Sequence, residues 1–267
     1  MIKADYHIHT KFCDGKNTPE EMALSALQKG FQTLGFSAHG YTVSDSSYCL
    51  KDVEGYIKEI NRLKGKYKND IEIYLGIEEE IFHPVQREDY DYIISSSHYT
   101  FKNGKYYSLD GSIDHFKESL KAWDNNAMAL AENYFDVLYN YIIKRKPDII
   151  GHFDLITKFD EKCDPVFLGN PEYEKLAEQA IKKALTADCI FEVNTGAISR
   201  GYRTAPYPAS NLLYLIKRND GKIILNSDSH SAENIGFCFD ETRAILRDIG
   251  FKNVYVLHRN KFICQEI

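Results

Sequence analysis

Short apolar segments alternate along the chain with longer amphipathic segments, and this alternation predicts the class of fold. The apolar segments, which are typical of buried strands, lie at residues 4–10, 33–37, 71–77, 92–97, 148–151, 189–193, 222–225 and 253–257. The amphipathic segments carry apolar residues at helical spacing and lie at residues 18–30, 52–67, 113–144, 172–186, 210–218 and 240–249. A strand followed by a helix, repeated about seven times, predicts a parallel sheet, most simply a barrel.

The alternation breaks once, between residues 100 and 112. Asn103-Gly104 stands there between aromatic residues, which is the signal of a tight β-hairpin turn. We expect this segment to leave the barrel and to cover one end of the molecule as a lid. Its candidates for contact with an aromatic ring or an ammonium group of a ligand are Phe101, Tyr106, Tyr107 and Asp110.

The predicted strands end in residues that can bind metal ions. Side chains two apart in a strand point to the same face, so His7 and His9 can approach one ion together. Six of the nine histidines lie at predicted strand ends, which random placement would seldom produce. The polar residues at these ends are His7, His9, His39, Glu78, His98, His152, Asn194, Asp228 and His230. Because the active site of an α/β barrel lies where its strands end, the pattern predicts a metal site there.

Composition and charge limit the classes of protein to which the chain can belong. The 267 residues fit a single α/β barrel domain, and 43% hydrophobic residues with a mean hydropathy of -0.42 indicate a soluble globular chain. The net charge of -6 argues against a nucleic-acid partner held by bulk positive charge. No apolar run approaches the ~18 residues that a membrane helix requires.

The cysteines and the N-terminal segment indicate a cytoplasmic protein. The six cysteines stand apart at residues 13, 49, 163, 189, 238 and 264, which indicates reduced thiols. The histidine pair begins at residue 7, so we expect no signal peptide. The expected partner is therefore a small molecule, and neither a membrane nor a nucleic acid. The sequence leaves the oligomeric state open.

Several ordered motifs resemble the polymerase and histidinol phosphatase (PHP) family. They are Asp5-Tyr6-His7-Ile8-His9-Thr10, Gly35-Phe36-Ser37-Ala38-His39, Gly76-Ile77-Glu78, Ser97-His98 and Ser227-Asp228-Ser229-His230. The stretch from Ile150 to Phe159, around His152, resembles the histidinol-phosphatase branch. The resemblance extends over residues 5–237 and implies a single distorted (β/α)7 barrel, with a metal site at the C-terminal ends of its strands. One departure is Ala38, where many relatives carry an acidic residue, but this is not a ligand position.

The resemblance implies a centre of three divalent ions of zinc, iron or manganese. The first ion would be held by His7, His9, Glu78 and Asp228, the second by Glu78, His98 and His152, and the third by Asp14, His39 and His230. The inventory of imidazoles and carboxylates suits these metals. Glu78 and Glu80 share a strand face, so spacing leaves both open as the shared ligand, and the Gly-x-Glu pattern of the family favours Glu78. Glu79, on the other face, is expected to be a solvated charge.

Such a centre suits the hydrolysis of phosphate monoesters. Three divalent ions and three carboxylates leave a charge of about +3 if the histidines are neutral, and this charge attracts a phosphate dianion. A water molecule activated by the metals, whose pKa can fall from 15.7 to about 7, would be the nucleophile. The resemblance implies a histidinol-phosphatase, which converts L-histidinol phosphate into L-histidinol and phosphate in histidine biosynthesis.

Two other functions stay open. Another PHP phosphoesterase would act on nucleotides or nucleic-acid ends, which the negative charge and the lack of an added polymerase domain disfavour. A metal-binding scaffold without turnover would be marked by missing ligands, whereas the full set is present here.

A few further residues are candidates for contact with the substrate. Asp228, His230 and Arg200 are taken as catalytic residues, and Arg200, Lys158 and Tyr99 as substrate-binding residues. Arg200 follows a strand and could clamp the phosphate with two parallel hydrogen bonds, with Arg203 as the alternative. Solvated loop charges are expected at Asp154 and Asp160, and a surface or capping role at His115. The proton donor to the leaving group stays open.

Overall fold

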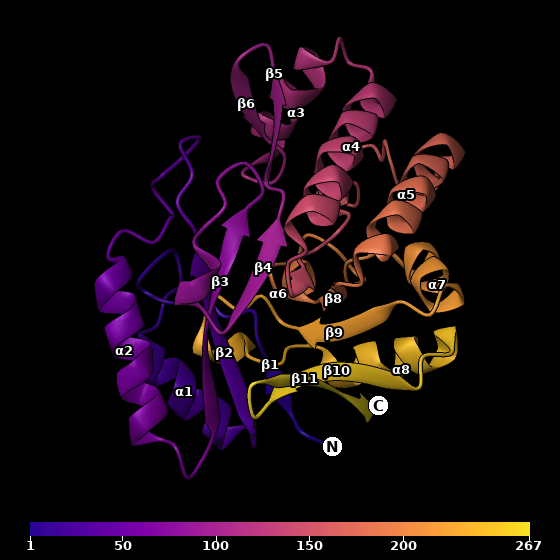
Figure 1. The fold of residues 1–267 in the computed structure, drawn as a ribbon. Helices are drawn as coiled ribbons and strands as arrows, with labels where there is room; N and C mark the ends of the chain where they lie inside the picture. The colour runs from indigo at the N-terminus through magenta and orange to yellow at the C-terminus, as the bar shows by residue number, and fades with distance from the viewer.

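A seven-stranded parallel sheet, curved until it nearly closes into a barrel, forms the centre of the molecule (Figure 1). The computed structural model describes residues 1–267. The strands follow one another around the sheet in chain order. Their bounds are β1 Ala4–Asp5, β2 Thr33–His39, β3 Glu72–Glu80, β4 Tyr92–Ser96, β7 Ile149–Ile150, β8 Ile190–Asn194 and β9 Lys222–Asn226. The predicted barrel of seven parallel strands is thus confirmed.

The barrel closes between segments from opposite ends of the chain. Ile8 and Ser229 form an isolated parallel bridge. Beside it, the amide of His9 donates to the carbonyl oxygen of Ser229, and the amide of Ser229 donates to that of His7, both at 2.9 Å. These bonds lie beyond the ends of β1 and β9. The closure therefore places His7 and His9 beside residues 227–230.

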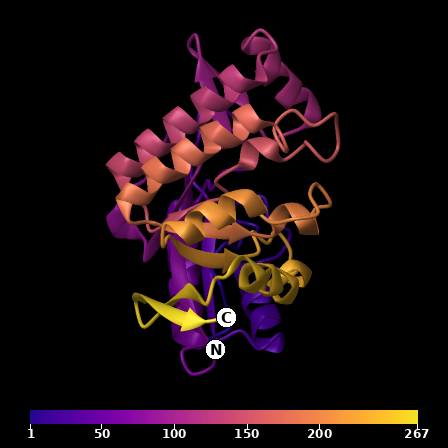
Figure 2. The same cartoon turned by 90° about the vertical axis from the view of Figure 1, so that its right-hand side faces the viewer.

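Most of the helices cover the outside of the sheet, whereas the helix at Ile113–Ala122 packs beside residues 105–108. Their bounds are α1 Pro19–Gln28, α2 Val53–Lys66, α3 Ile113–Ala122, α4 Ala127–Arg145, α5 Pro171–Ala184, α6 Gly196–Ser199, α7 Ser210–Arg218 and α8 Phe239–Ile249. Short 3-10 helices occur at Arg87–Asp89, Leu155–Thr157, Leu185–Ala187 and Ala232–Asn234. The long helices α4 and α5 pack side by side (Figure 2). None of the helices combines the length and the apolar character needed to span a membrane.

Residues 113–144 form two helices, where the sequence predicted one helical stretch. The break falls at Asp124 and Asn125, whose φ angles of 55° and 58° are left-handed. A right-handed helix cannot continue through such residues, and α4 starts afresh with Asn126 as its N-cap.

The last predicted strand lies outside the barrel. β10 (Asn253–His258) pairs in antiparallel fashion with β11 (Lys261–Glu266), and the two form a separate hairpin. Val256 and Leu257 are buried in one apolar cluster with residues such as Ala4 and Tyr74. The hairpin therefore covers the end of the barrel at which its strands begin.

Aromatic side chains fill the barrel near that end. The hydroxyl of Tyr92 donates to the carbonyl oxygen of Tyr6 at 2.6 Å, and the hydroxyl of Tyr6 donates to the carbonyl oxygen of Leu257 at 2.7 Å. Gly76 makes room for this packing, because a Cβ at its position would lie 2.2 Å from the Tyr92 ring. One end of the interior is thus closed, and the polar side chains gather at the other.

The predicted hairpin rises from the chain just after β4 (Figure 1). β5 (Tyr99–Lys102) pairs in antiparallel fashion with β6 (Lys105–Ser108). Asn103 and Gly104 form the turn with φ angles of 52° and 79°, as the Asn-Gly signal predicts. The segment after β6 then returns toward the barrel.

Candidate metal centre

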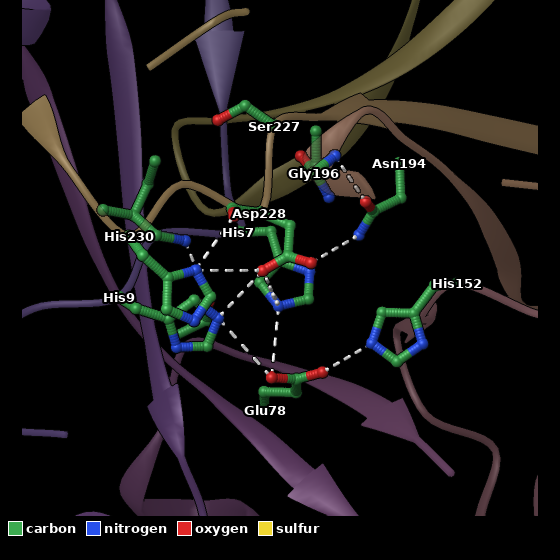
Figure 3. A network of polar contacts seen from close by, with 12 residues as sticks. His7, His9, Glu78, His152, Asn194, Gly196, Ser227, Asp228 and His230 are labelled. Atoms are coloured by element: carbon green, nitrogen blue, oxygen red, sulfur yellow. Dashed lines mark hydrogen bonds and ion pairs between the residues drawn. The ribbon is translucent and has the colours of Figure 1, made fainter. Parts of the chain in front are cut away.

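The side chains predicted to bind metal lie together at the C-terminal ends of the strands. His7, His9 and Asp14 follow β1, His39 ends β2, Glu78 lies in β3, His98 follows β4, His152 follows β7, and Asp228 and His230 follow β9. Figure 3 shows His7, His9, Glu78, His152, Asp228 and His230 pointing toward one another. The C-terminal ends of parallel strands lie at one edge of the sheet, so residues that are far apart in the sequence come together there.

The Glu78 carboxylate lies in the middle of this group. Its Oε2 is 2.9 Å from His39 Nδ1 and 3.2 Å from His7 Nε2. Its Oε1 is 3.1 Å from His152 Nε2 and 3.4 Å from His98 Nε2. The two oxygens face different imidazoles, so this carboxylate has the geometry to be shared between two ions.

Asp14 and Asp228 add two more carboxylates to this group of side chains. Asp228 Oδ1 lies 3.3 Å from His9 Nε2 and 3.7 Å from His7 Nε2. Asp14 Oδ2 lies 3.2 Å from His230 Nε2, and its Oδ1 lies 3.6 Å from His39 Nε2. Asp14 and Asp228 therefore contact partly different sets of histidines.

The residues present fit divalent metal ions. Potential ligand atoms within 4.8 Å of one another form three overlapping groups, which are His9, Asp14, His39 and His230; His7, His9 and Glu78; and His39, Glu78 and His98. His7 Nε2, His9 Nε2 and Glu78 Oε2 are buried and lack a hydrogen-bond partner. Buried polar atoms are rarely left unpaired, so their convergence points to a cation between them.

Burial and mutual contact set the protonation of the metal-free cluster. Burial, with the neighbouring His230 and His39, lowers the pKa of His9 to about 3, so its imidazole is neutral. Burial acts to raise the pKa of Glu78, but His7 and His39 outweigh it and hold that pKa well below its ordinary value. Neutral imidazoles and ionised carboxylates are the forms that bind metals.

His7 and His98 behave differently from His9. Burial acts to lower both pKa values, but nearby carboxylates outweigh it and raise them well above the ordinary value for histidine. The carboxylates are chiefly Glu192 for His7 and Glu78 for His98. In the metal-free chain these two imidazoles therefore hold protons that an incoming ion must displace.

The three consecutive glutamates of β3 have three different surroundings. Glu78 faces the other predicted ligands, whereas Glu80 Oε2 accepts from the His98 amide at 2.9 Å and lies 3.1 Å from His98 Nδ1. Glu79 points to the opposite face of the sheet, where it is fully buried and lies 2.9 Å from Arg145 Nη2. The expectation of a solvated Glu79 is wrong, because α4 covers that face and supplies the guanidinium.

Two polar groups beside the predicted ligands were not foreseen from the sequence. Glu192 in β8 is fully buried, and its Oε1 lies 2.6 Å from His7 Nδ1. A signal for it was present, because it is a lone carboxylate in an otherwise apolar strand, two residues before Asn194. Tyr48 meets the His39 ring edge-on, with ring centroids 4.8 Å apart. It lies in a polar loop where no periodicity marks it.

Arg200, the predicted phosphate-binding residue, contacts two of the predicted metal ligands. Its Nη2 donates to Asp228 Oδ2 at 2.9 Å, and its Nη1 lies 3.2 Å from His230 Nδ1. Arg200 also lines the cavity described below. Asp228 acts against burial to raise the pKa of Arg200 above its ordinary value, so this cation is permanent.

Arg203, the alternative to Arg200, is buried away from this cavity. Its Nη1 donates to Thr157 Oγ1 at 2.7 Å and lies 3.6 Å from Asp154 Oδ2. Asp154 and Asp160 are themselves buried, and Asp160 Oδ2 accepts from the Phe167 amide at 2.8 Å. The expectation of solvated charges at these two positions is wrong, because the loop folds back and uses both carboxylates as internal acceptors.

Lys158 and Tyr99, the other predicted substrate contacts, both line the cavity. Lys158 Nζ donates to the carbonyl oxygen of Asp110 at 2.7 Å and lies 3.4 Å from Asp110 Oδ2. Asp110, expected as an ammonium partner, is therefore already paired with a cation. The hydroxyl of Tyr48 donates to that of Tyr99 at 3.1 Å.

A cavity of about 600 Å³ opens from the metal centre toward the hairpin. Five tyrosines line it, which are Tyr48, Tyr99, Tyr106, Tyr107 and Tyr202. Phe101 is 41% exposed and does not line the cavity, so its predicted role in ring contact has no support. His115 is exposed in the first turn of α3, as expected for a surface or capping residue, and it also lines the rim of the cavity.

Comparison with known proteins gives relatives over nearly the whole chain. The probable histidinol-phosphatase of Schizosaccharomyces pombe is 28% identical over an alignment that covers 95% of this chain and 89% of that protein. The histidinol-phosphatase of Bacillus subtilis is 27% identical over an alignment that covers 90% of this chain and 98% of that protein.

A solved structure with a similar fold also covers nearly the whole chain. The crystal structure of histidinol phosphate phosphatase from Lactococcus lactis, complexed with zinc, L-histidinol and phosphate, has a TM-score of 0.74. It is 20% identical and covers 98% of both chains. Residues 5–196 match the family model described as the PHP domain. Since this match covers most of its length, the chain belongs to the PHP domain family.

Proposed function

We propose that this protein is a metal-dependent histidinol-phosphatase, which hydrolyses L-histidinol phosphate to L-histidinol and phosphate. The observation that carries the proposal is the convergence of nine histidine, aspartate and glutamate side chains beside a cavity that also contains Arg200 and Lys158. Relatives that span nearly the whole chain are named histidinol-phosphatases. The activity belongs to the phosphoric monoester hydrolases.

The proposed centre holds three divalent ions of zinc, iron or manganese. His7, His9, Glu78 and Asp228 would bind the first, Glu78, His98 and His152 the second, and Asp14, His39 and His230 the third. A relative of the same fold was crystallised with zinc. When bound, such ions supply an activated water as the nucleophile and neutralise charge on the phosphate. Three groups of potential ligand atoms that lie within 4.8 Å of one another support this proposal, although they divide the histidines differently and include neither His152 nor Asp228.

Arg200 is proposed to bind and orient the phosphate. Its guanidinium is held by Asp228 and by the contact with His230, so few rotamers need to be frozen when the substrate binds. Lys158 supplies a second positive charge on the cavity wall, and Asp110 holds it in place. Two fixed cations beside the metal centre favour a dianionic group over a neutral one.

The rest of the cavity is proposed to receive the organic part of the ester. Tyr99 is held by its hydrogen bond with Tyr48, and both rings line the wall. Tyr106 and Tyr107 extend this wall from the hairpin. Flat aromatic surfaces of this kind suit an imidazole ring, and they favour a cationic ring further.

We further propose that residues 1–267 act as one PHP barrel domain, because the sheet closes between segments from the two ends of the chain. All six cysteines are unpaired, in keeping with the expected cytoplasmic location. The proposed partner is the small phosphomonoester.

The test compares L-histidinol phosphate, nucleotides and p-nitrophenyl phosphate as substrates for the purified, metal-loaded protein. We expect the highest kcat/KM for histidinol phosphate. A preference for nucleotides or nucleic-acid ends would identify a different phosphoesterase of the same family. Full metal content without hydrolysis of any of these esters would identify a metal-binding scaffold.

A further inference from the structure

A buried carboxylate beside the metal centre has no part in the function proposed above. Glu192 in β8 has no exposed surface. Its Oε1 lies 2.6 Å from His7 Nδ1 and accepts from Asn226 Nδ2 at 2.9 Å. Its Oε2 accepts from the His152 amide and from Asn194 Nδ2, both at 2.9 Å. Burying a carboxylate is costly unless donors surround it, and here each oxygen has two.

The contacts of Glu192 join the strands on both sides of the barrel closure. His7 follows β1, His152 follows β7, and Asn226 ends β9, while Glu192 itself lies in β8. One side chain in the interior therefore ties together four of the seven strands. Two of the groups that it holds, His7 and His152, belong to predicted metal ligands.

Backbone pairing across the closure is sparse. β1 is only two residues long, and its continuation meets the segment after β9 through the isolated bridge between Ile8 and Ser229. Asn226 adds a side-chain link, because its Oδ1 accepts from the Tyr6 amide at 3.0 Å while its Nδ2 donates to Glu192. Side chains thus take the place of missing ladder bonds where the sheet closes.

The same carboxylate selects which nitrogen of His7 faces the metal centre. An ionised glutamate only accepts hydrogen bonds, so His7 Nδ1 must carry the proton in their contact. His7 Nε2 is then the ligand atom, and it points to Glu78 Oε2 at 3.2 Å. Carboxylates that hold the far nitrogen of an imidazole in this way fix its orientation and raise its basicity toward a metal.

The network continues to a third predicted ligand. Asn194 Nδ2 donates to Glu192 Oε2. It also lies 3.3 Å from Asp228 Oδ2. Figure 3 shows the contact between Asn194 and Asp228. The amide of Gly196 donates to Asn194 Oδ1 at 2.8 Å and fixes which end of the Asn194 amide faces the carboxylates. Glu192 is therefore connected to His7, His152 and Asp228.

We propose that Glu192 is a positioning residue, which sets the ligand atoms of the metal centre and ties the closing strands together before any ion binds. The inference rests on the proposed metal centre. Glu192 acts through His7 and His152 and does not touch the substrate. Its loss should therefore weaken metal binding first, and lower turnover only as a consequence.

The variant Glu192→Gln tests this, because it keeps the size of the side chain and removes its charge. Binding of Zn²⁺ to the metal-free, full-length chain is measured by competition with a chromophoric chelator. We expect the zinc affinity of at least one site to fall roughly 10- to 100-fold. The unfolding temperature of the metal-free chain is measured in parallel, so that a loss of fold is recognised.

Glu79→Gln is the matched control. Glu79 is also a fully buried glutamate, but its partners, such as Arg145, lie on the outer face of the sheet. This variant should lower the unfolding temperature and leave the zinc affinity unchanged. An equal loss of zinc affinity in both variants would mean that Glu192 acts only by stabilising the barrel.

A double-mutant cycle shows whether the effect passes through His7. Added to His7→Gln, the Glu192→Gln change should cost less zinc affinity than it does in the wild-type chain, because one of its two ligand contacts is already lost. Equal costs in both backgrounds would show that Glu192 does not act through His7.

Glu192→Asp covers the case in which Glu192→Gln fails to fold. It keeps the charge but withdraws the carboxylate by one methylene, so contact with His7 is lost and zinc affinity should again fall. Zinc binding within about twofold of wild type in the folded variants would overturn the proposal. Because zinc binding is measured without substrate, the result does not depend on which ester the protein hydrolyses.

Discussion

Arg200 and Asp228 are joined by two hydrogen bonds at the mouth of the metal centre. Arg200 Nη2 donates to Asp228 Oδ2 at 2.9 Å, and Arg200 Nη1 donates to the Asp228 carbonyl oxygen at 3.0 Å. Asp228 has a φ of 49°, in the left-handed region that few residues other than glycine adopt. The guanidinium thus holds both the side-chain carboxylate and the backbone carbonyl of Asp228, a strained residue that is itself a predicted metal ligand.

Arg200→Ala is expected to lower kcat/KM for histidinol phosphate roughly 100-fold, which corresponds to about 2.7 kcal/mol of transition-state stabilisation. Metal content should stay intact, because Asp228 keeps its contacts with His7 and His9. Arg200→Lys should restore only part of the rate, since an ammonium cannot form two parallel bonds. Arg218→Ala, at the exposed end of α7, is the control. An unchanged kcat/KM in Arg200→Ala would remove this residue from phosphate binding.

His152→Ala is expected to reduce kcat by orders of magnitude and to lower the metal content. His152 Nε2 lies 3.1 Å from the shared carboxylate of Glu78, so its loss opens the coordination of one ion. Steady-state kinetics and elemental analysis of the same preparation measure the two effects. His258→Ala is the control, because His258 contacts Glu72 at the other end of the barrel. Near-normal turnover in His152→Ala would exclude His152 from the site.

Metal analysis should find about three transition-metal ions per chain in protein purified without chelators. Dialysis against a chelator should abolish hydrolysis, and Zn²⁺ or Mn²⁺ should restore it. One ion or none after reconstitution would contradict the proposed set of nine ligands.

Metal affinity should rise with pH through neutrality. His7 and His98 have pKa values raised well above 6.5 in the metal-free chain, so both are protonated near pH 7. Their contribution to the stability of the metal-free fold is full below the unfolded pKa of about 6.5 and is lost as the pH rises through the folded values. Binding of an ion displaces these protons, so calorimetry in buffers of different ionisation enthalpy should detect proton release. An affinity that fell with rising pH would contradict this protonation.

The hairpin offers a matched pair of variants for substrate choice. Tyr106 and Phe101 contact each other, with ring centroids 4.8 Å apart, but only Tyr106 lines the cavity. Tyr106→Ala should lower kcat/KM for histidinol phosphate at least tenfold, about 1.4 kcal/mol, while hydrolysis of p-nitrophenyl phosphate persists. Phe101→Ala should change neither rate. If both substrates lose rate in parallel in Tyr106→Ala, the hairpin supports the barrel and does not select the substrate.

The sequence by itself determined the barrel and the positions of the predicted ligands. Buried parallel strands are short apolar runs, and their ends meet at one edge, so a histidine or carboxylate that follows such a run is recognisable without coordinates. His39, His98 and His152 were predicted as ligands in this way. The Asn-Gly turn could also be predicted from the local sequence, because its left-handed backbone depends on those two residues alone.

Only the tertiary structure decided which carboxylates face the metal centre and which support the fold. Glu78 and Glu80 share a strand face, and their different roles follow from where His98 lies beside them. Glu79 is buried because Arg145, far along the chain, meets it from α4. Glu192 can contact His7 only because the closure of the barrel brings the two residues together. Pairings between residues distant in the chain depend on packing, and no local pattern encodes them.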